Sequence, residues 1–178
     1  MRRLRKLRRF LDFIASRLFF VTLLCALFIL VFYLAMNTAN IWILVDEGLD
    51  ARAGAVLMQT GTEGLSKYFR EEFLVQDPIL TVGTGDQSPY RDYTVKSYRH
   101  QVQMRSVWCW PWESTATADI EESVPYINGT LKKEIRSQLV SENEEILNPP
   151  AWETRRYRVT LVRNAGRWKI SNLQQVER

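Results

Sequence analysis

The pattern of hydrophobic and polar residues divides the chain into three parts. Residues 18–36, LFFVTLLCALFILVFYLAM, are almost continuously apolar and carry no charged side chain. Apolar residues then recur every three or four positions up to about residue 58, and from residue 93 onward they tend to alternate with polar ones. The first spacing is typical of a helix with one buried face, and alternation is typical of a half-buried strand. The sequence therefore predicts an apolar helix, then amphipathic helices, then a sheet.

The apolar segment 18–36 has the length of a membrane-spanning helix. Its 19 residues would extend about 28 Å as a helix, close to the ~30 Å hydrocarbon core of a bilayer. Residues 1–17 hold seven basic side chains and one acidic side chain. Basic residues beside a span tend to stay in the cytoplasm. We therefore predict a single-pass protein of the cell membrane, with a basic cytoplasmic tail (1–17), a transmembrane helix (18–36) and an extracytoplasmic domain.

A cleaved signal peptide is the alternative interpretation of this segment. Signal peptides have apolar regions of about 7–15 residues and a small-residue cleavage site. Segment 18–36 is longer, and no A-x-A motif directly follows it. Both features favour an uncleaved anchor.

The net charge of +4 is a property of the N-terminal tail. Residues 1–17 contribute +6, so the rest of the chain carries −2. Because the apolar segment follows the basic residues at once, we expect no nucleic-acid partner. The two cysteines, Cys25 in the apolar segment and Cys109 outside it, cannot pair with each other across that geometry. Cys109 is then a small buried residue or half of an intermolecular disulfide.

Two amphipathic helices are expected before the sheet. A juxtamembrane helix, 37–58, continues from the anchor with an apolar stripe and an opposite charged side that includes Arg52. Thr62 then reads as the N-cap of a second helix, which ends at Asp77-Pro78. The remainder of the extracytoplasmic domain is 59–178.

The second half of the domain reads as antiparallel strands. Residues 93–112 alternate in two phases, which a bulge near Ser97 would reconcile. A second strand follows from residue 116, Asn128-Gly129 indicates a turn, and residues 157–170 form a hairpin. Residues 131–147 fit either a helix or an exposed excursion. The predicted fold class is α+β, with N-terminal helices on a curved antiparallel sheet.

This order of elements resembles the nuclear transport factor 2-like fold, a cone of helices packed against a strongly bent sheet. Residues 62–69, TEGLSKYF, resemble its helix, and residues 157–162 with 166–170 resemble its closing hairpin. The resemblance covers about residues 45–175. With the tail and span in front, the chain is similar to membrane-anchored bacterial assembly factors of conjugation and type IV secretion, to sporulation-channel proteins and to stand-alone anchored domains. In those groups the domain usually docks to partners.

The residues give little support to catalysis. His100 is the single histidine, and no Cys or Asp stands at ligand spacing from it. Nucleotide-binding glycine loops and the Gly-x-Ser-x-Gly motif do not occur. We therefore expect no catalytic residue, no cofactor and no metal, and a protein that is not an enzyme.

Glu122 is the most interesting acidic residue because it has the apolar parity of Ile120 and Val124. A carboxylate inside a cone would have a raised pKa and could act as a general base, with Tyr126 beside it in a pocket. This is the basis of an alternative function, a small-ligand-binding or isomerase-like domain. A bulge or strand end would instead leave Glu122 in solvent, and we favour that interpretation.

Trp108, Trp110 and Trp112 form the most unusual stretch, because they stand at alternate positions of one strand. Large aromatic residues usually pack in a core, which is the interpretation we favour. Tryptophan is also typical of protein interfaces and of the membrane–water interface, and Pro111 fits an edge strand. The three tryptophans are therefore the candidate interface.

These features predict a membrane-anchored docking or scaffold domain that takes part in the assembly of a membrane complex. Its expected partners are the lipid bilayer and other membrane or secretion-complex proteins, and self-association is left open. A purely structural anchor, whose basic tail binds anionic lipid, is a further alternative.

Overall fold

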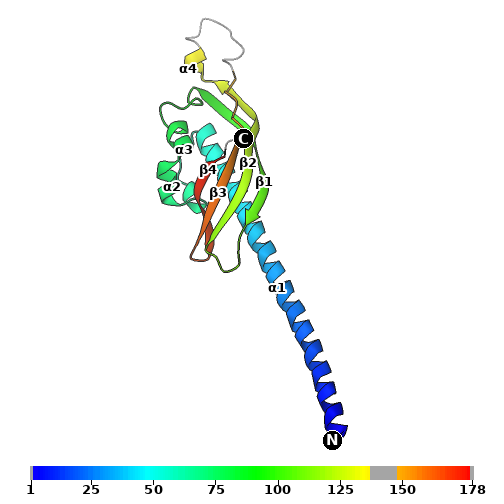
Figure 1. Ribbon diagram of the computed structural model, residues 1–178. Helices are drawn as coiled ribbons and strands as arrows, with labels where there is room; N and C mark the ends of the chain where they lie inside the picture. The colour runs from blue at the N-terminus through cyan, green and yellow to red at the C-terminus, as the bar shows by residue number, and fades with distance from the viewer. Residues whose placement is uncertain (1, 137–147, 177–178) are drawn as a thin grey trace.

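The computed structural model describes residues 2–136 and 148–176. A long helix comes first, followed by short helices and a sheet (Figure 1). The elements are α1 (Arg2–Leu57), η1 (Leu65–Lys67), α2 (Glu71–Gln76), α3 (Pro78–Gly83), β1 (Tyr93–Trp108), β2 (Thr115–Leu131), α4 (Lys133–Arg136), β3 (Arg155–Asn164) and β4 (Arg167–Gln175). The predicted α+β class is confirmed, with a long apolar helix before a curved antiparallel sheet.

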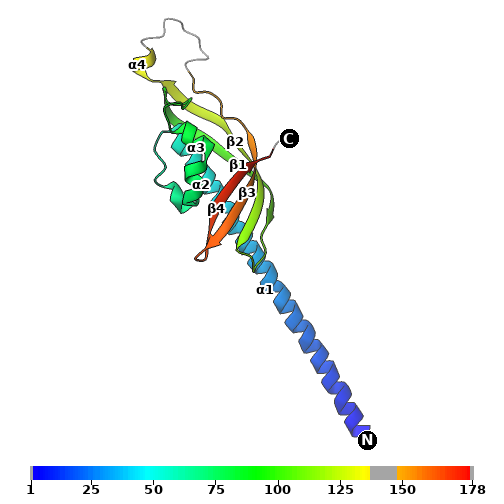
Figure 2. The same cartoon turned by 60° about the vertical axis from the view of Figure 1, so that its left-hand side comes forward.

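The helix α1 is uninterrupted over 56 residues, which is about 84 Å at 1.5 Å per residue. Its N-terminal part projects away from the domain, and its C-terminal part lies along the sheet (Figures 1 and 2). The projecting part exposes large apolar side chains such as Leu18, Phe28 and Ile29. This part is long and apolar enough to cross a membrane. The expected juxtamembrane helix 37–58 is the continuation of the same helix.

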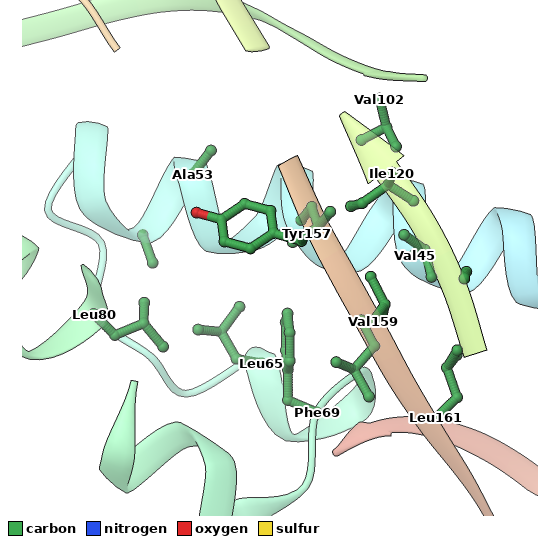
Figure 3. Close-up of a cluster of buried hydrophobic side chains, with 14 of the residues drawn as sticks. Val45, Ala53, Leu65, Phe69, Leu80, Val102, Ile120, Tyr157, Val159 and Leu161 are labelled. Carbon is green, nitrogen blue, oxygen red and sulfur yellow. The ribbon is translucent and has the colours of Figure 1, made fainter. Parts of the chain in front are cut away.

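The hydrophobic core lies between α1 and one face of the sheet, and the short helices close its side (Figure 3). Residues of α1 at three- and four-residue spacing enter it from one side. The fully or almost fully buried members from α1 are Ile41, Val45, Leu49, Ala53 and Val56. Residues at alternate positions of the strands enter it from the other side. These include Ala118, Ile120, Val159 and Leu161. The two periodicities thus meet in one core.

The sheet has the order β1-β2-β3-β4, and each strand is antiparallel to its neighbours. The pairing of β1 with β2 is interrupted by three register shifts. The first lies between Val95 and Ser97, which confirms the predicted bulge near Ser97. Bulges bend a strand and increase its twist, so these shifts explain how the two long strands curve.

The predicted second helix is divided, which corrects the expectation of one helix from residue 62 to residue 77. The backbone N–H of Ile170 donates to the carbonyl of Tyr68 (2.8 Å), and the N–H of Arg70 donates to the carbonyl of Ile170 (2.9 Å). This pairing with β4 separates η1 from α2. The expected helix end at Asp77-Pro78 is confirmed, because α2 ends at Gln76 with Asp77 as its C-cap. Asp77 also caps the start of α3, since its side chain accepts from the N–H of Ile79 (3.1 Å). Pro78 fits the first turn, where its missing N–H has no helical partner.

Asn128-Gly129 lies inside β2, not at a turn as expected. Gly129 pairs with Val95. A Cβ at Gly129 would lie 2.8 Å from Pro149 Cγ and 3.1 Å from the carbonyl oxygen of Thr94. The glycine therefore permits a close approach of other segments. In the sequence, a glycine with this role cannot be distinguished from a glycine in a turn.

The last two strands form the expected hairpin. Ala165 and Gly166 lie at its turn with φ of 48° and 80°. In the ambiguous segment 131–147, α4 covers Lys133–Arg136, and residues 137–147 lie outside the described residues.

We expect Gly83→Ala to destabilise the domain, because the end of α3 packs directly on α1. The added Cβ would lie 2.6 and 2.8 Å from the two Cγ atoms of Val56. Overpacking of this kind costs about 1–3 kcal/mol of unfolding free energy, which denaturant unfolding of the full chain in detergent measures. In a Val56→Ala background both Cγ atoms are gone, so the same change should cost less. Equal costs in the two backgrounds would contradict this packing.

Candidate functional site

Four ionisable side chains from different parts of the fold meet in the interior. Arg52 comes from α1, Asp77 precedes α3, His100 lies on β1 and Glu122 lies on β2. The residues Arg52, Asp77 and Glu122 are 1%, 2% and 0% exposed, and the His100 side chain is 4% exposed. We call these four residues the buried ionic cluster.

Arg52 lies at the centre of the buried ionic cluster. Its Nε donates to Asp77 Oδ2 (2.6 Å) and its Nη2 donates to Asp77 Oδ1 (3.0 Å). Its Nη1 lies 3.6 Å from Glu122 Oε2, and the other Glu122 oxygen, Oε1, lies 3.2 Å from His100 Nε2. The guanidinium also lies over the Tyr157 ring, 5.8 Å from its centroid. One cation thus holds two buried carboxylates from two different elements.

The electrostatics keep Arg52 charged. Burial by itself would lower the pKa of the guanidinium, but the hydrogen bonds and charge of Asp77, with the charge of Glu122, outweigh it and hold that pKa above its usual value. Buried ion pairs of this kind are strongly destabilising to break, because an uncompensated charge stays in the interior. The cluster therefore fastens α1 to the start of α3 and to the sheet.

The burial of Glu122 corrects the interpretation that its carboxylate lies in solvent. The bulge comes later in the strand: Gln101 pairs with Ser123, but Arg99 pairs with Tyr126. The alternation of β2 reverses after Val124 for this reason, and Tyr126 is 54% exposed. Tyr126 therefore does not line the interior beside Glu122, which corrects the second expected pocket residue.

Sequence reasoning missed Arg52 and Asp77 as members of a site. Its neighbours Asp46, Glu47 and Asp50 indicate that Arg52 lies on the charged side of its helix, but it follows Leu49 by three residues and precedes Val56 by four. Residues at that spacing share one helix face. The pattern therefore contained the signal, and the charge of the residue obscured it. Nothing local in the sequence indicates that Asp77 is its partner.

A cavity of about 460 Å³ lies beside the cluster, between α2, α3 and the last two strands. Its wall includes Arg52, Asp77, Arg155 and Tyr157, but Glu122 does not line it. A second, more apolar hollow of about 490 Å³ includes Trp152 in its wall and does not include Glu122 either. Within the described ranges, no group of three or more His, Cys, Asp or Glu side chains could hold a metal ion.

The three candidate interface tryptophans stack on one another where β1 leads into β2. The rings of Trp108 and Trp110 meet edge to face with centroids 5.4 Å apart, and those of Trp110 and Trp112 stack with centroids 5.1 Å apart. Trp108 is 60% exposed and Trp112 is 73% exposed, so the favoured expectation of core packing is wrong for these two. Trp110 is half-buried. We call the three residues the tryptophan edge, since β1 is an edge strand of the sheet.

Arg163, near the end of β3, connects the sheet to α1 by hydrogen bonds near the end of the apolar segment. Its Nη1 donates to the Tyr33 hydroxyl (3.0 Å), and its Nη2 donates to Asn37 Oδ1. Its backbone N–H donates to the carbonyl of Ser114 in the connection between β1 and β2 (2.7 Å). One residue therefore joins both hairpins to the helix at the end of the apolar segment.

The chain matches none of the known protein families, curated proteins or solved structures with which it was compared. The nuclear transport factor 2-like resemblance therefore stays a prediction from the sequence.

Proposed function

We propose that this chain is a single-pass membrane protein whose extracytoplasmic domain docks to other proteins during assembly of a membrane complex. The basic tail lies in the cytoplasm, and the apolar part of α1 spans the bilayer. The domain acts by being held at a fixed place and orientation beside the membrane. It performs no chemistry in this role.

The observation that carries the proposal is the continuity of α1. The helix has no break between the apolar segment and the core residues Ile41 and Val45, both 0% exposed. Arg163 adds a second connection through Tyr33 and Asn37. A domain joined in this way cannot turn freely about its anchor, as a domain on a flexible linker could. A scaffold needs a rigid connection in order to present its surface in a fixed direction. A domain that binds a freely diffusing small ligand does not need one.

The same helix supports an uncleaved anchor over a signal peptide. A cleavage site would have to lie just after the apolar segment, inside α1 and near Asn37, which is 6% exposed. The part of the helix beyond it supplies one wall of the core. Removal of the span would therefore cut through the domain's own packing.

The outer face of the sheet is the surface we assign to protein docking. Charged side chains on it are arranged in pairs between neighbouring strands. They include Arg158 Nε with Asp119 Oδ1 (2.9 Å) and Arg156 Nε with Glu121 Oε2 (3.0 Å). We also propose that the domain has the cone-shaped nuclear transport factor 2-like arrangement that the sequence resembles, and the packing of α1 against the opposite face of the sheet supports this.

The small-ligand alternative rests on the cavity of about 460 Å³, which offers Arg155 and Tyr157 as polar groups. Its proposed base is in the wrong place, however. Glu122 contacts Arg52 and His100 and does not line the cavity. We therefore prefer docking.

Photocrosslinking in intact membranes tests the docking proposal. A photoreactive residue at Gln103, which pairs with Glu121 in the sheet, should give adducts with another membrane protein that mass spectrometry identifies. The matched control is the same residue at Val75, which is 81% exposed on α2 at the helical side, and it should give none. Monomer alone at both positions, or the same adducts at both, would contradict docking through the outer face.

A further inference from the structure

The tryptophan edge lies at the membrane end of the domain. Trp110 and Trp112 belong to the connection between β1 and β2, and this connection is bonded through Ser114 to Arg163. Arg163 in turn donates to the hydroxyl of Tyr33, three residues before the end of the apolar segment. In Figure 1 the lower ends of β1 and β3 point along α1 toward its N-terminal part. The tryptophans are therefore held near the level at which α1 leaves the bilayer.

The exposure of these rings is unusual for a domain in water. Trp108 and Trp112 expose 60% and 73% of their surface, whereas Trp168 of the same domain is 7% exposed. Tryptophan has an apolar body and one N–H donor, and it is enriched where a membrane meets water. Tyr33 and Trp42, on α1 on either side of the end of the apolar segment, are partly exposed in the same zone.

One charge nearby suits lipid head groups. Arg167 is exposed at the tip of the β3–β4 hairpin, whereas the Arg163 guanidinium is already bonded to Tyr33 and Asn37 and lies over the Trp168 ring. Guanidinium groups bind phosphate well. Glu113 is the acidic exception in the connection itself, and it is exposed.

Resting on the proposed function, we infer that the tryptophan edge binds the head-group region of the leaflet from which α1 emerges. The domain then touches the bilayer at two places, the helix and the edge strand. Two contacts fix the tilt of the domain, which one helix alone cannot do. The outer face of the sheet is thereby turned sideways, in the direction of neighbouring membrane proteins.

Spin labelling of the full chain in vesicles tests this inference. In a background with Cys25 and Cys109 replaced by serine, the label is attached at Glu113→Cys, which leaves all three tryptophans in place. The protein is reconstituted in phosphatidylcholine–phosphatidylglycerol vesicles. We expect a severalfold loss of collisions with a water-soluble nickel complex, and retained collisions with oxygen, relative to a label at Tyr126→Cys. Tyr126 is the matched control because it is exposed and lies near the other end of β2.

Each other outcome overturns the inference. Equal access of the nickel complex at both positions means that the edge lies in water. Loss of collisions with both reagents at position 113, together with dipolar coupling between labels, means that a second copy covers the edge. As an independent measurement, brominated lipids should quench tryptophan fluorescence less in a variant with all three edge tryptophans changed to glutamine. Crosslinking at Gln103 is independent of these results, so docking can fail while lipid contact holds, and the reverse.

Discussion

Arg52→Met is expected to lower the free energy of unfolding by about 3–5 kcal/mol. Methionine keeps a long side chain in the core but removes the cation between Asp77 and Glu122, which are 2% and 0% exposed. Asp77 then loses both of its hydrogen bonds from Arg52, and the Glu122 carboxylate is left with His100. Denaturant unfolding of the full chain in detergent, followed by tryptophan fluorescence, measures the loss.

The matched control is Arg158→Met on the outer face. Arg158 makes a similar bond to a carboxylate, 2.9 Å from Asp119, but the two side chains are 56% and 41% exposed. Because water solvates the partner left behind, this change should leave stability almost unaltered. Equal effects of the two substitutions would show that burial of the ionic cluster does not matter.

A triple variant separates charge from packing. Asp77→Asn and Glu122→Gln, added to Arg52→Met, remove the two carboxylates that the single change leaves uncompensated. Asparagine at position 77 keeps an acceptor for the N–H of Ile79, so the start of α3 stays capped. We expect the triple variant to recover part of the lost stability, since uncharged polar groups cost less to bury than charges. No recovery would attribute the loss to the packing of the Arg52 stem.

The features predicted correctly from the sequence are those that depend only on a short segment of the chain. The apolar segment, the helical stripe after it and the final hairpin each follow from which side of a single element is buried. The features that it missed depend on distant partners. Residues 68–70 leave the helix because Ile170 pairs with them, and Gly129 serves the approach of Pro149. Neither contact can be read from the local pattern.

The candidate site divides in the same way. The alternation of β2 places Glu122 on the buried face of the strand. Whether its carboxylate is stable in the interior depends on Arg52 and His100, which come from two other elements. The prediction of buried positions from an alternating strand also assumes that the whole surface of the domain faces water. For Trp108 and Trp112 that assumption fails if part of the surface faces lipid, because a ring that is exposed to water in an isolated domain is covered in a bilayer.

Asn40→Pro is expected to abolish assembly of the protein with its partner while leaving the domain folded. Asn40 is exposed on α1 between the apolar segment and the core, so its side chain is not part of the core. Proline there removes a helical hydrogen bond and clashes with the carbonyl of Met36, which costs an uninterrupted helix about 3 kcal/mol or more. A helix that restarts at this point tolerates proline in its first turn, and the core residues from Ile41 onward can keep their packing. Co-purification of the crosslinked partner measures assembly.

The orientation of the domain gives the second readout. In the background with Cys25 and Cys109 replaced by serine, spin labels are attached at Ala35→Cys and Glu63→Cys, both exposed. The unaltered helix should then give one narrow distance distribution and Asn40→Pro a broad one. Asn40→Ala is the control, because alanine keeps the helix and should change neither the distances nor the partner recovered. If Asn40→Pro broadens the distances and the partner is still recovered, the domain works as a tethered module and rigid placement is not its function. If the distances stay narrow, the Arg163 bonds to Tyr33 and Asn37 hold the domain in place without the helix, and adding Arg163→Met should release it.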